Sequence, residues 1–287
     1  MKILVTGGNG FIARYVIEEA LADGHEVFTN TRMVGNVMPD YFAKCTVYLI
    51  DSRDKIGMRS IIEKVDGVIN LAGILGTKHV DNAKDFYENN VFSALNVYDA
   101  CTEFDIPVVQ IAVGNHFETN NYSNSKTAAE RDCLMYTKYS GMKGNVVRGL
   151  NVVGPYQKVK NTGKIAPTFI TQALKGEDLK VYGGMDKCGI MDFIYVRNIA
   201  KILLEVLQSG SYGNVYEAGT GLGHSVWDIA NEIVRLTKSK SKVVAVPMRA
   251  GEGEQSRVVA ENPYPFEYTS LEDMLELAID YYRDHAE

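Results

Sequence analysis

A glycine-rich turn between the first expected strand and the first expected helix constrains the fold of this chain more than any other feature. The sequence ILVTGGNGFIARYV has β-branched residues in Lys2–Thr6, glycines at Gly7 and Gly10, and a helical pattern over Phe11–Ala22. Such glycines permit a tight turn whose backbone N–H groups approach a pyrophosphate at the helix N-terminus. Ala13 takes the third small position, which serves close helix-to-strand packing. The turn predicts a dinucleotide-binding α/β fold.

The first half of the chain alternates short β-branched runs with helical patterns. Strands separated by crossovers of this length are expected to lie parallel, with helices on both faces of one sheet. The sequence therefore predicts a doubly wound parallel Rossmann sheet, which binds its ligand at the carboxyl edge where the strand order reverses. The further expected strands are Glu26–Asn30, Thr46–Ile50, Gly67–Leu71, Val108–Ala112 and Gly144–Arg148, and the further expected helices are Phe86–Glu103 and Ser123–Tyr139.

The second half of the chain has longer loops and shorter elements. We expect residues 1–150 to form the dinucleotide-binding Rossmann domain and residues 151–287 to form mainly a smaller C-terminal substrate lobe. Segments near residues 190–218 are expected to return to the first sheet. The helices expected in this half are Pro167–Leu174, Asn198–Gln208, Val226–Thr237 and Leu271–Tyr282.

Composition and charge disfavour several classes of protein. The chain has 287 residues, a formal charge of −6 and no basic block, which argues against a nucleic-acid partner. No stretch approaches the roughly 18 apolar residues of a membrane span, and no leader precedes the first strand, so we expect a cytoplasmic protein without a membrane partner. The four cysteines are widely spread and form no CxxC pair, so neither a metal site nor a disulfide framework is expected.

The end of the second expected strand indicates which dinucleotide binds. A carboxylate at this place hydrogen-bonds the ribose of NAD, whereas a basic residue accommodates the 2′-phosphate of NADP. The sequence VFTNTRM offers Asn30, Thr31 and Arg32 and no acid, and Arg14 in the first helix is a possible second cation. The sequence therefore predicts that NADP(H) is preferred over NAD(H).

The stretch NNYSNSKTAAERD places Tyr122 and Lys126 four positions apart at the start of an expected helix. Side chains with this spacing lie on one side of a helix. Taken alone, the pair is either a proton-transfer couple or two polar residues on a solvated helix face. The other motifs of the chain decide between these interpretations.

In the order of its motifs the chain resembles the extended short-chain dehydrogenase/reductases, in particular the NAD-dependent epimerase/dehydratase group that acts on nucleotide sugars. The resemblance runs over nearly the whole sequence. It rests on TGGNGFIA, LIDSRD, NLAGI, ENNVFSALNV, YSNSK, VVRGLNVVGP, VYGGMDKCGIMDFIYVRNIA and PMRAGE, in that order. The resemblance implies a Rossmann fold, a nicotinamide coenzyme, a nucleotide-sugar substrate and, by analogy, a homodimer.

The resemblance also implies which residues bind the coenzyme. The first turn holds the pyrophosphate, Asp51 contacts the adenine, and the NLAGI segment after the fourth strand and Asn90 also bind the coenzyme. Together with Arg32, the expected coenzyme-binding residues are Gly7, Gly10, Phe11, Ile12, Asp51, Leu71, Ala72, Gly73, Asn90, Tyr122 and Lys126.

In the family, the tyrosine of YxxxK is the general acid/base and the lysine holds the nicotinamide ribose, which the match carries onto Tyr122 and Lys126. A free phenol titrates near 10, so a base at neutral pH needs its pKa lowered by roughly 3 units, or about 4 kcal/mol. Lys126 and the positive nicotinamide ring would favour phenolate. The proton-transfer interpretation of the pair is therefore preferred.

The sequence departs from the family directly after the fifth expected strand. The family has a Ser or Thr there that hydrogen-bonds the reacting oxygen, whereas this chain has Ala112, Val113 and Gly114. The nearest groups that could polarise a carbonyl are Asn115 and Thr119, with His116 as a third. The dehydratase members place an Asp-Glu pair where this chain has Gly114 and Asn115, and neither residue transfers a proton at neutral pH. A sugar 4,6-dehydratase is therefore disfavoured.

The resemblance places the diphosphate of the substrate against the second half of the chain. Asn151 and Arg249 would bind it, and Arg257 is a further candidate, because a guanidinium group binds two phosphate oxygens at once. Met191 stands where the family often has Arg.

The main interpretation is an NAD(P)-dependent oxidoreductase or epimerase that transfers a hydride on a nucleotide-activated sugar, of the 4-epimerase or ketoreductase type. One alternative is a non-catalytic NADP(H)-binding sensor or scaffold of the same fold, which the missing Ser or Thr favours. Another is a reductase of a small non-nucleotide carbonyl compound. The sequence predicts no metal cofactor for any of these functions.

Overall fold

The part of the chain that the computed structural model describes comprises residues 1–32, 39–76, 82–159, 163–248 and 256–285. It forms two compact units. The first consists of Met1–Arg148 and Ile199–Tyr216, and the second of Gly149–Asn198 and Glu217–Glu287. Within the described ranges, no helix is long and apolar enough to cross a membrane.

The first unit is built around a sheet of seven strands in the order β11-β6-β5-β4-β1-β2-β3. The pairs β3–β2, β2–β1, β1–β4 and β4–β5 are parallel. From β1 the chain runs outward to β2 and β3 and then returns to place β4 on the other side of β1. The doubly wound Rossmann sheet is therefore confirmed, and its order reverses between β1 and β4. The strands are β1 (Lys2–Thr6), β2 (Glu26–Asn30), β3 (Thr46–Tyr48), β4 (Gly67–Asn70), β5 (Val108–Val113), β6 (Gly144–Gly149) and β11 (Val215–Ala218).

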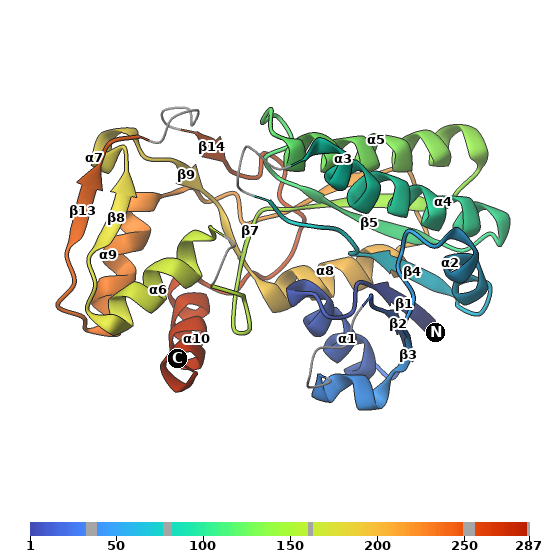
Figure 1. Cartoon of the computed structure of the whole chain (residues 1–287), viewed down its shortest axis with the longest axis horizontal. Coiled ribbons are helices and arrows are strands. Elements are labelled where there is room, and N and C mark those ends of the chain that lie inside the picture. Colours follow the sequence, from blue (N-terminus) through green and yellow to red (C-terminus); the bar gives the residue numbers. More distant parts are fainter. Residues whose placement is uncertain (33–38, 77–81, 160–162, 249–255, 286–287) are drawn as a thin grey trace. The chain divides into compact units, whose positions relative to one another are not determined.

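Helices cover both faces of this sheet (Figure 1). Helices α4 (Ser93–Glu103) and α5 (Asn121–Ser140) lie on one face, with α2 (Lys55–Ile62) packed against α4. Helices α1 (Phe11–Ala22) and α8 (Val196–Gln208) lie on the other face. The apolar sides of α2, α4 and α5 form one core with the central strands. The carboxyl ends of β1, β4 and β5 lead into loops.

The helix expected over Phe86–Glu103 is divided in the structure. It consists of the short α3 (Ala83–Phe86), a π-helical turn η2 (Tyr87–Phe92) and then α4. Between β2 and β4 the structure also contains two elements that periodicity did not reveal, the 3₁₀ turn η1 (Asp40–Lys44) and α2. Helix α2 is held at its start by Asp54, whose carboxylate accepts from the N–H of Gly57 at 3.0 Å. Short elements with a glycine in the first turn give little periodic signal.

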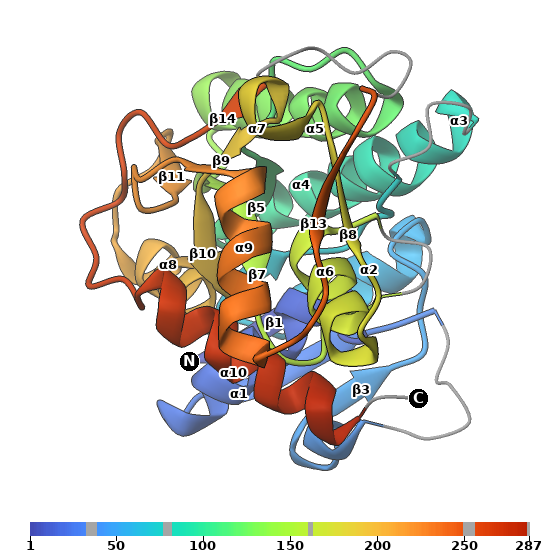
Figure 2. The same ribbon diagram turned by 90° about the vertical axis from the view of Figure 1, so that its left-hand side faces the viewer.

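The second unit consists of small sheets and helices. Helices α6, α9 and α10 pack together (Figure 2), and β8 pairs in parallel with β13 beside them. The elements are β7 (Asn151–Val153), α6 (Ile165–Lys175), β8 (Leu179–Tyr182), α7 (Gly184–Lys187), β9 (Ile190–Met191), β10 (Phe193–Tyr195), β12 (His224–Ser225), α9 (Val226–Thr237), β13 (Val243–Val246), β14 (Arg257–Val258) and α10 (Leu271–Asp284).

Asp192, between β9 and β10, ties three segments of the second unit together. Its side chain is fully buried. Its carboxylate accepts hydrogen bonds from the N–H and hydroxyl of Thr220 at 2.9 and 2.6 Å, from the N–H of Gly221 at 2.8 Å and from the N–H of Ala260 at 3.2 Å. Because charged hydrogen bonds are the strong ones, this residue fixes the loops that follow β11 and β14.

Candidate functional site

The glycine turn after β1 is packed too closely for side chains. Gly7 has φ +70°, in the left-handed region, and a Cβ atom there would lie 3.1 Å from the Cα of Ala72. A Cβ atom at Gly8 would lie 2.2 Å from Oγ1 of Thr29. Gly10 donates its N–H to the carbonyl of Gly7 at 2.8 Å and closes the turn. Sequence analysis singled out Gly7 and Gly10 but missed Gly8, because only the fold brings Thr29 against it.

The N-cap residue of α1 is a glycine, which has no side chain to cap the helix. Gly10 is the N-cap, it offers no side-chain hydrogen bond, and the first turn contains no acidic residue. Phe11 and Ile12 begin the helix and are half-buried. The exposed N–H groups and the positive end of the helix dipole therefore suit a pyrophosphate.

The end of β2 carries a buried amide rather than an acid. The side-chain nitrogen of Asn30 donates to the carbonyl of Ile50 at 2.9 Å and to the hydroxyl of Ser52 at 3.0 Å. Its side-chain oxygen is buried and has no partner among the described residues. Thr31 follows it and is buried. The end of β2 therefore has no carboxylate of the kind that binds an unphosphorylated ribose. It has an amide that is hydrogen-bonded to the residues following β3.

The two arginines near this strand end differ in what they bind. Arg14 lies over the ring of Tyr41, 5.0 Å from its centroid, and forms ion pairs with Glu18 at 2.9 Å and Asp40 at 3.2 Å. Arg32 is exposed and donates one hydrogen bond, to the amide oxygen of Asn89 at 3.0 Å. Arg14 is therefore held by two carboxylates, whereas Arg32 hydrogen-bonds a neutral amide among the described residues and lies close enough to Asp51 to lower the pKa of that carboxyl group.

Asp51 follows β3 and is paired with a neighbouring arginine. Its carboxylate accepts from the guanidinium of Arg53 at 2.7 Å. This hydrogen bond, opposed by burial, keeps the pKa of Asp51 below its ordinary value. The side chain is therefore an anion held in one orientation, able to accept from an amino group.

The segment after β4 is bound to β1 and to the π-helical turn. The N–H groups of Leu71 and Ala72 donate to the hydroxyl of Thr6 at 3.0 and 2.9 Å. A Cβ atom at Gly73 would lie 2.7 Å from Oδ1 of Asn90, so only glycine fits there. The backbone of this segment is thereby held at the carboxyl edge of the sheet.

Asn90 links this segment to α5. Its side-chain oxygen accepts from the N–H of Ile74 at 2.7 Å, and its side-chain nitrogen donates to the carbonyl of Ile74 at 3.2 Å and to Oγ of Ser125 at 3.0 Å. The π-helical turn η2 presents this side chain, and such turns recur at functional sites. Asn90 therefore connects two expected parts of the site, since its partner Ser125 directly precedes Lys126.

Tyr122 lies in the first turn of α5. The side chain of Asn120 caps this helix by accepting from the N–H of Ser123 at 2.8 Å, which starts the helix two residues before the expected position. The ring of Tyr122 lies 6.4 Å from that of Phe86, edge to face. Burial raises the pKa of Tyr122 to about 12, which favours the neutral phenol.

Lys126 lies one turn further along α5 and is buried, with 5% of its surface exposed. Among the described residues, no hydrogen bond or ion pair of its ammonium is found, and Nζ is not one of the buried polar atoms that are closed off from solvent without a partner. Burial lowers the pKa of Lys126 to about 8. Without a further positive charge nearby, a proton would leave Lys126 before it leaves Tyr122. Phenolate formation therefore depends on a bound group.

The loop between β5 and α5 is closed by an acidic residue that sequence analysis did not single out. The side-chain amides of Asn115 and Asn120 donate to Oε2 of Glu118 at 2.9 and 3.2 Å. Nδ1 of His116 lies 3.2 Å from the carbonyl of Gly114. Glu118 thus holds the amide of Asn115, the first expected substitute for the missing hydroxyl. An acid beside two asparagines in NHFETNN was the available signal.

The remaining expected residues lie in this loop and in the second unit. Thr119 is exposed in the loop. In the second unit, Asn151 donates its side-chain amide to the carbonyl of Asp192 at 3.0 Å, and Arg257 is exposed at the start of β14. Arg249 lies outside the described residues.

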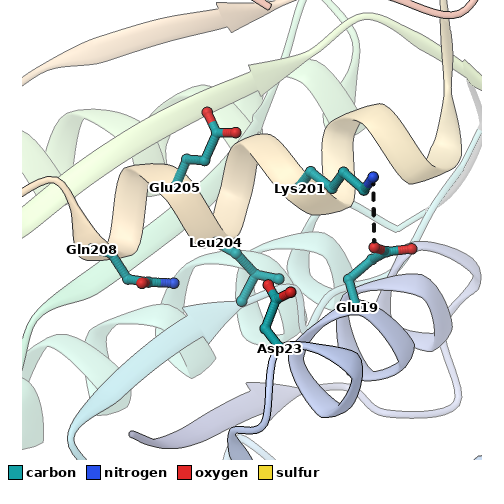
Figure 3. A pocket seen from close by; sticks show the side chains of 6 residues that line it. All are labelled: Glu19, Asp23, Lys201, Leu204, Glu205 and Gln208. Carbon is teal, nitrogen blue, oxygen red and sulfur yellow. Dashed lines mark ion pairs between the residues drawn. The ribbon is translucent and has the colours of Figure 1, made fainter.

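A surface groove lies between α1 and α8 of the first unit, and none of the expected site residues lines it (Figure 3). Its lining is largely acidic, and the ammonium of Lys201 points to Glu19 at 3.9 Å. An acidic lining does not suit a pyrophosphate. Across the described residues, no group of three or more His, Cys, Asp or Glu side chains is placed to hold a metal ion. The groove is lined by Glu19, Asp23, Lys201, Leu204, Glu205 and Gln208.

Comparison with known proteins gives a consistent family match. The model of the family described as NAD dependent epimerase/dehydratase matches residues 3–219. The UDP-N-acetyl-alpha-D-glucosaminuronate decarboxylase of Bacillus cytotoxicus is 26% identical over 280 residues, covering 86% of this chain and 83% of that protein. A trifunctional enzyme of Arabidopsis thaliana, whose activities include UDP-glucose 4,6-dehydratase, is 27% identical over 269 residues, covering 82% of this chain but only 39% of that protein.

A solved structure agrees with these sequence matches. The UDP-glucose 4-epimerase of Thermus thermophilus, solved in complex with NAD, is 25% identical to this chain. It superimposes with a TM-score of 0.82, covering 99% of each chain.

Proposed function

The chain belongs to the NAD dependent epimerase/dehydratase family, and from this premise we propose that it transfers a hydride on a nucleotide-activated sugar. The reaction is a 4-epimerisation or the reduction of a keto sugar. Among its relatives, the decarboxylase and the 4-epimerase are named for UDP-sugar substrates. The proposed coenzyme lies on the first unit, across the carboxyl ends of β1 and β4 where the strand order reverses.

One observation carries the proposal. Lys126 is a largely buried lysine for which no ion pair or hydrogen bond is found among the described residues, and it lies on the same face of α5 as Tyr122. A buried charge without compensation costs several kcal/mol. The ribose hydroxyl groups of a nicotinamide coenzyme provide the missing acceptors and explain why the chain keeps this lysine.

The residues of the first unit fit such a coenzyme. The turn at Gly7 and Gly8 brings backbone N–H groups to an uncapped helix start, which suits the pyrophosphate. Asp51 is an oriented anion suited to the adenine amino group. Leu71, Ala72, Gly73 and Asn90 are held at the carboxyl edge of the sheet, where the proposed coenzyme would bind.

In this proposal, Tyr122 transfers the proton, and the charge of Lys126 lowers the pKa of Tyr122. The bound coenzyme supplies the hydride acceptor or donor and, when oxidised, a positive ring. That charge and Lys126 oppose the burial that raises the pKa of Tyr122 to about 12. The phenol oxygen takes the proton of the sugar hydroxyl on oxidation and returns it on reduction.

The loop after β5 supports hydride transfer without elimination. Gly114 and Asn115 provide no acid/base at the positions where dehydratases have one, and Glu118 is occupied by the amides of Asn115 and Asn120. We infer that the protein is not a 4,6-dehydratase, although a relative includes that activity. Asn115 and Thr119 remain our candidates to polarise the substrate oxygen in place of the missing hydroxyl.

We further propose a preference for NADP(H), with Arg32 as the 2′-phosphate partner. The support is the absence of an acid at the end of β2 and the exposure of Arg32, whose hydrogen bond within the described residues is to the neutral amide of Asn89. Arg14 is a poorer candidate because Glu18 and Asp40 already hold it. The 4-epimerase structure contains NAD, so the preference needs a direct measurement.

The second unit is proposed to bind the nucleotide diphosphate through Asn151 and Arg249, and the protein is proposed to form a homodimer. The missing Ser or Thr after β5 favours a second candidate function, a non-catalytic NADP(H) sensor. A reductase of a small non-nucleotide carbonyl compound would not need Arg249.

The deciding experiment is turnover of a panel of UDP- and dTDP-hexoses and their keto derivatives with either coenzyme. We expect activity on one of them, and we expect Tyr122→Phe to abolish it while coenzyme affinity stays within threefold. Activity that survives Tyr122→Phe would refute the role of the tyrosine. Tight coenzyme binding without turnover of any substrate would favour the sensor. Unchanged activity in Arg249→Ala would point to a small carbonyl substrate.

A further inference from the structure

A chain of buried side chains crosses three neighbouring strands of the first unit, β1, β4 and β5. The hydroxyl of Thr6, at the end of β1, donates to the side-chain oxygen of Asn70 at 2.7 Å. The side-chain nitrogen of Asn70, at the end of β4, donates to the side-chain oxygen of Gln110 in β5 at 2.6 Å. The hydroxyl of Tyr98, from α4, lies 2.7 Å from the same oxygen. The network therefore runs from β1 to the helix layer.

The network is sealed and fully satisfied. Thr6, Asn70, Gln110 and Tyr98 are each at most 1% exposed. None of their side-chain nitrogen or oxygen atoms is among the buried atoms without a partner in the described chain. Burial raises the pKa of Tyr98 well above its ordinary value, so its hydroxyl stays a neutral donor. Polar side chains in the otherwise apolar strands GVIN and VVQIAV thus form one connected unit.

The two ends of the network lie at the two parts of the proposed site. At one end, Thr6 accepts from the N–H groups of Leu71 and Ala72. At the other end, the Tyr98 hydroxyl lies 3.0 Å from the carbonyl of Ala129, so its single hydrogen is shared between that carbonyl and Gln110. Ala129 is three residues beyond Lys126 in α5.

A second set of hydrogen bonds connects the segment after β4 to α5. Asn90 joins the backbone of Ile74 to the hydroxyl of Ser125. The segment Leu71–Ile74 is therefore connected to α5 once through the interior and once along the edge. Two connections between the same elements restrict rotation as well as translation of one against the other.

We propose that Tyr98 and Gln110 are positioning residues that set the place of the Leu71–Ile74 segment relative to Tyr122 and Lys126. The proposal rests on the proposed function for its catalytic consequence, since a misplacement of about 1 Å at the reacting atoms costs on the order of 10²-fold in rate. Its structural part, the coupling of the segment to α5, stands independently of any substrate.

The test variant is Tyr98→Phe, which removes the hydroxyl and keeps the ring. Gln110 then keeps its hydrogen bond from Asn70, and Ala129 remains within the helix, so the variant is expected to fold. The matched control is Thr102→Val on the same helix, which also removes a hydroxyl, one that donates to the carbonyl of Tyr98 at 2.7 Å outside the network.

The first measurement is amide hydrogen exchange, which needs neither coenzyme nor substrate. In Tyr98→Phe we expect exchange in the Leu71–Ile74 segment to become about tenfold faster, because opening there no longer has to break the interior connection. In Thr102→Val we expect no change in that segment. Unchanged exchange at Leu71–Ile74 in Tyr98→Phe, or equal acceleration in both variants, would overturn the coupling.

The second measurement is steady-state turnover of whichever substrate the panel identifies. We expect kcat of Tyr98→Phe to fall about tenfold while KM and the coenzyme Kd stay within twofold. A loss confined to KM, or no loss, would overturn the positioning role even if the exchange result held. If the chain binds no coenzyme, the proposed function fails, and the exchange measurement still decides the coupling.

Discussion

Lys126 in the first unit and Asp192 in the second are both buried charged side chains, and they differ in what surrounds them. Asp192 is fully buried and accepts hydrogen bonds from Thr220, Gly221 and Ala260. Lys126 is 5% exposed, and no hydrogen bond or ion pair of its ammonium is found among the described residues. Burying an uncompensated charge costs several kcal/mol. A compensated buried charge therefore indicates a structural role, and an uncompensated one indicates a ligand that completes it.

The contrast predicts a large loss of activity without loss of stability at Lys126. Lys126→Met is expected to lower kcat by about 10³-fold, or about 4 kcal/mol of transition-state stabilisation. Its resistance to urea should equal or exceed that of the wild type, because a buried unpaired charge is removed. Denaturation and turnover of the same preparation check both parts. A destabilised variant would show that Lys126 has a structural partner.

The opposite result is expected at Asp192. In Asp192→Asn the loss of at least two charged hydrogen bonds should lower the free energy of unfolding by about 4 kcal/mol. The control is Glu276→Gln on the exposed face of α10, where a change below about 0.5 kcal/mol is expected. Urea denaturation followed by circular dichroism measures both. An equally small effect at Asp192 would show that this carboxylate does not stabilise the fold.

The pH dependence of stability sharpens the comparison. Burial lowers the pKa of Lys126 from 10.5 to about 8 in the native state. Between these values the unfolded chain binds more protons than the native one, so the lysine's cost to stability shrinks as pH rises. Lys126→Met should exceed the wild type by about 3 kcal/mol at pH 7 and match it above pH 10.5. A difference that does not depend on pH would contradict the lowered pKa.

The same contrast applies on a smaller scale to the two arginines near β2. Arg32→Ala is expected to raise the Kd of NADPH about tenfold and to leave that of NADH unchanged, since only one has a 2′-phosphate. Arg14→Ala should leave the ratio of the two constants unchanged, because Glu18 and Asp40 hold that guanidinium. Calorimetric titration measures both constants. If only Arg14→Ala changed the ratio of the two Kd values, Arg14 and not Arg32 would be the partner of the 2′-phosphate.

The elements that sequence analysis predicted well are those with a strong local signal. The turn at Gly7 and Gly10 follows a strand and opens a helix, and the doubly wound sheet follows from the spacing of the β-branched runs. Helices α1 and α9 have the bounds expected from their apolar periodicity. Local patterns of this kind contain the information for elements and for their order.

What sequence analysis missed depends on contacts between distant residues. The π-helical turn that presents Asn90 breaks a continuous helical pattern, and periodicity alone does not show such a change of winding. The buried hydrogen bond from Asn70 to Gln110 joins residues 40 positions apart. Glu118 becomes part of the loop only because two asparagines converge on it. The partners of a side chain, unlike its helix or strand, are set by the whole fold.

The return of Ile199–Tyr216 to the first unit has a consequence for dissecting the protein. Leu207 of α8 covers Gly67 so closely that a Cβ atom there would lie 3.0 Å from the leucine side chain, and Ile199 and Leu203 are also buried. A fragment truncated after Arg148 would keep α1 but expose the part of that face that α8 covers, and an exposed apolar patch of this kind is prone to aggregation. To obtain the first unit alone, a designed linker would have to join Arg148 to Ile199. The fragment would then contain both segments of that unit, residues 1–148 and 199–216.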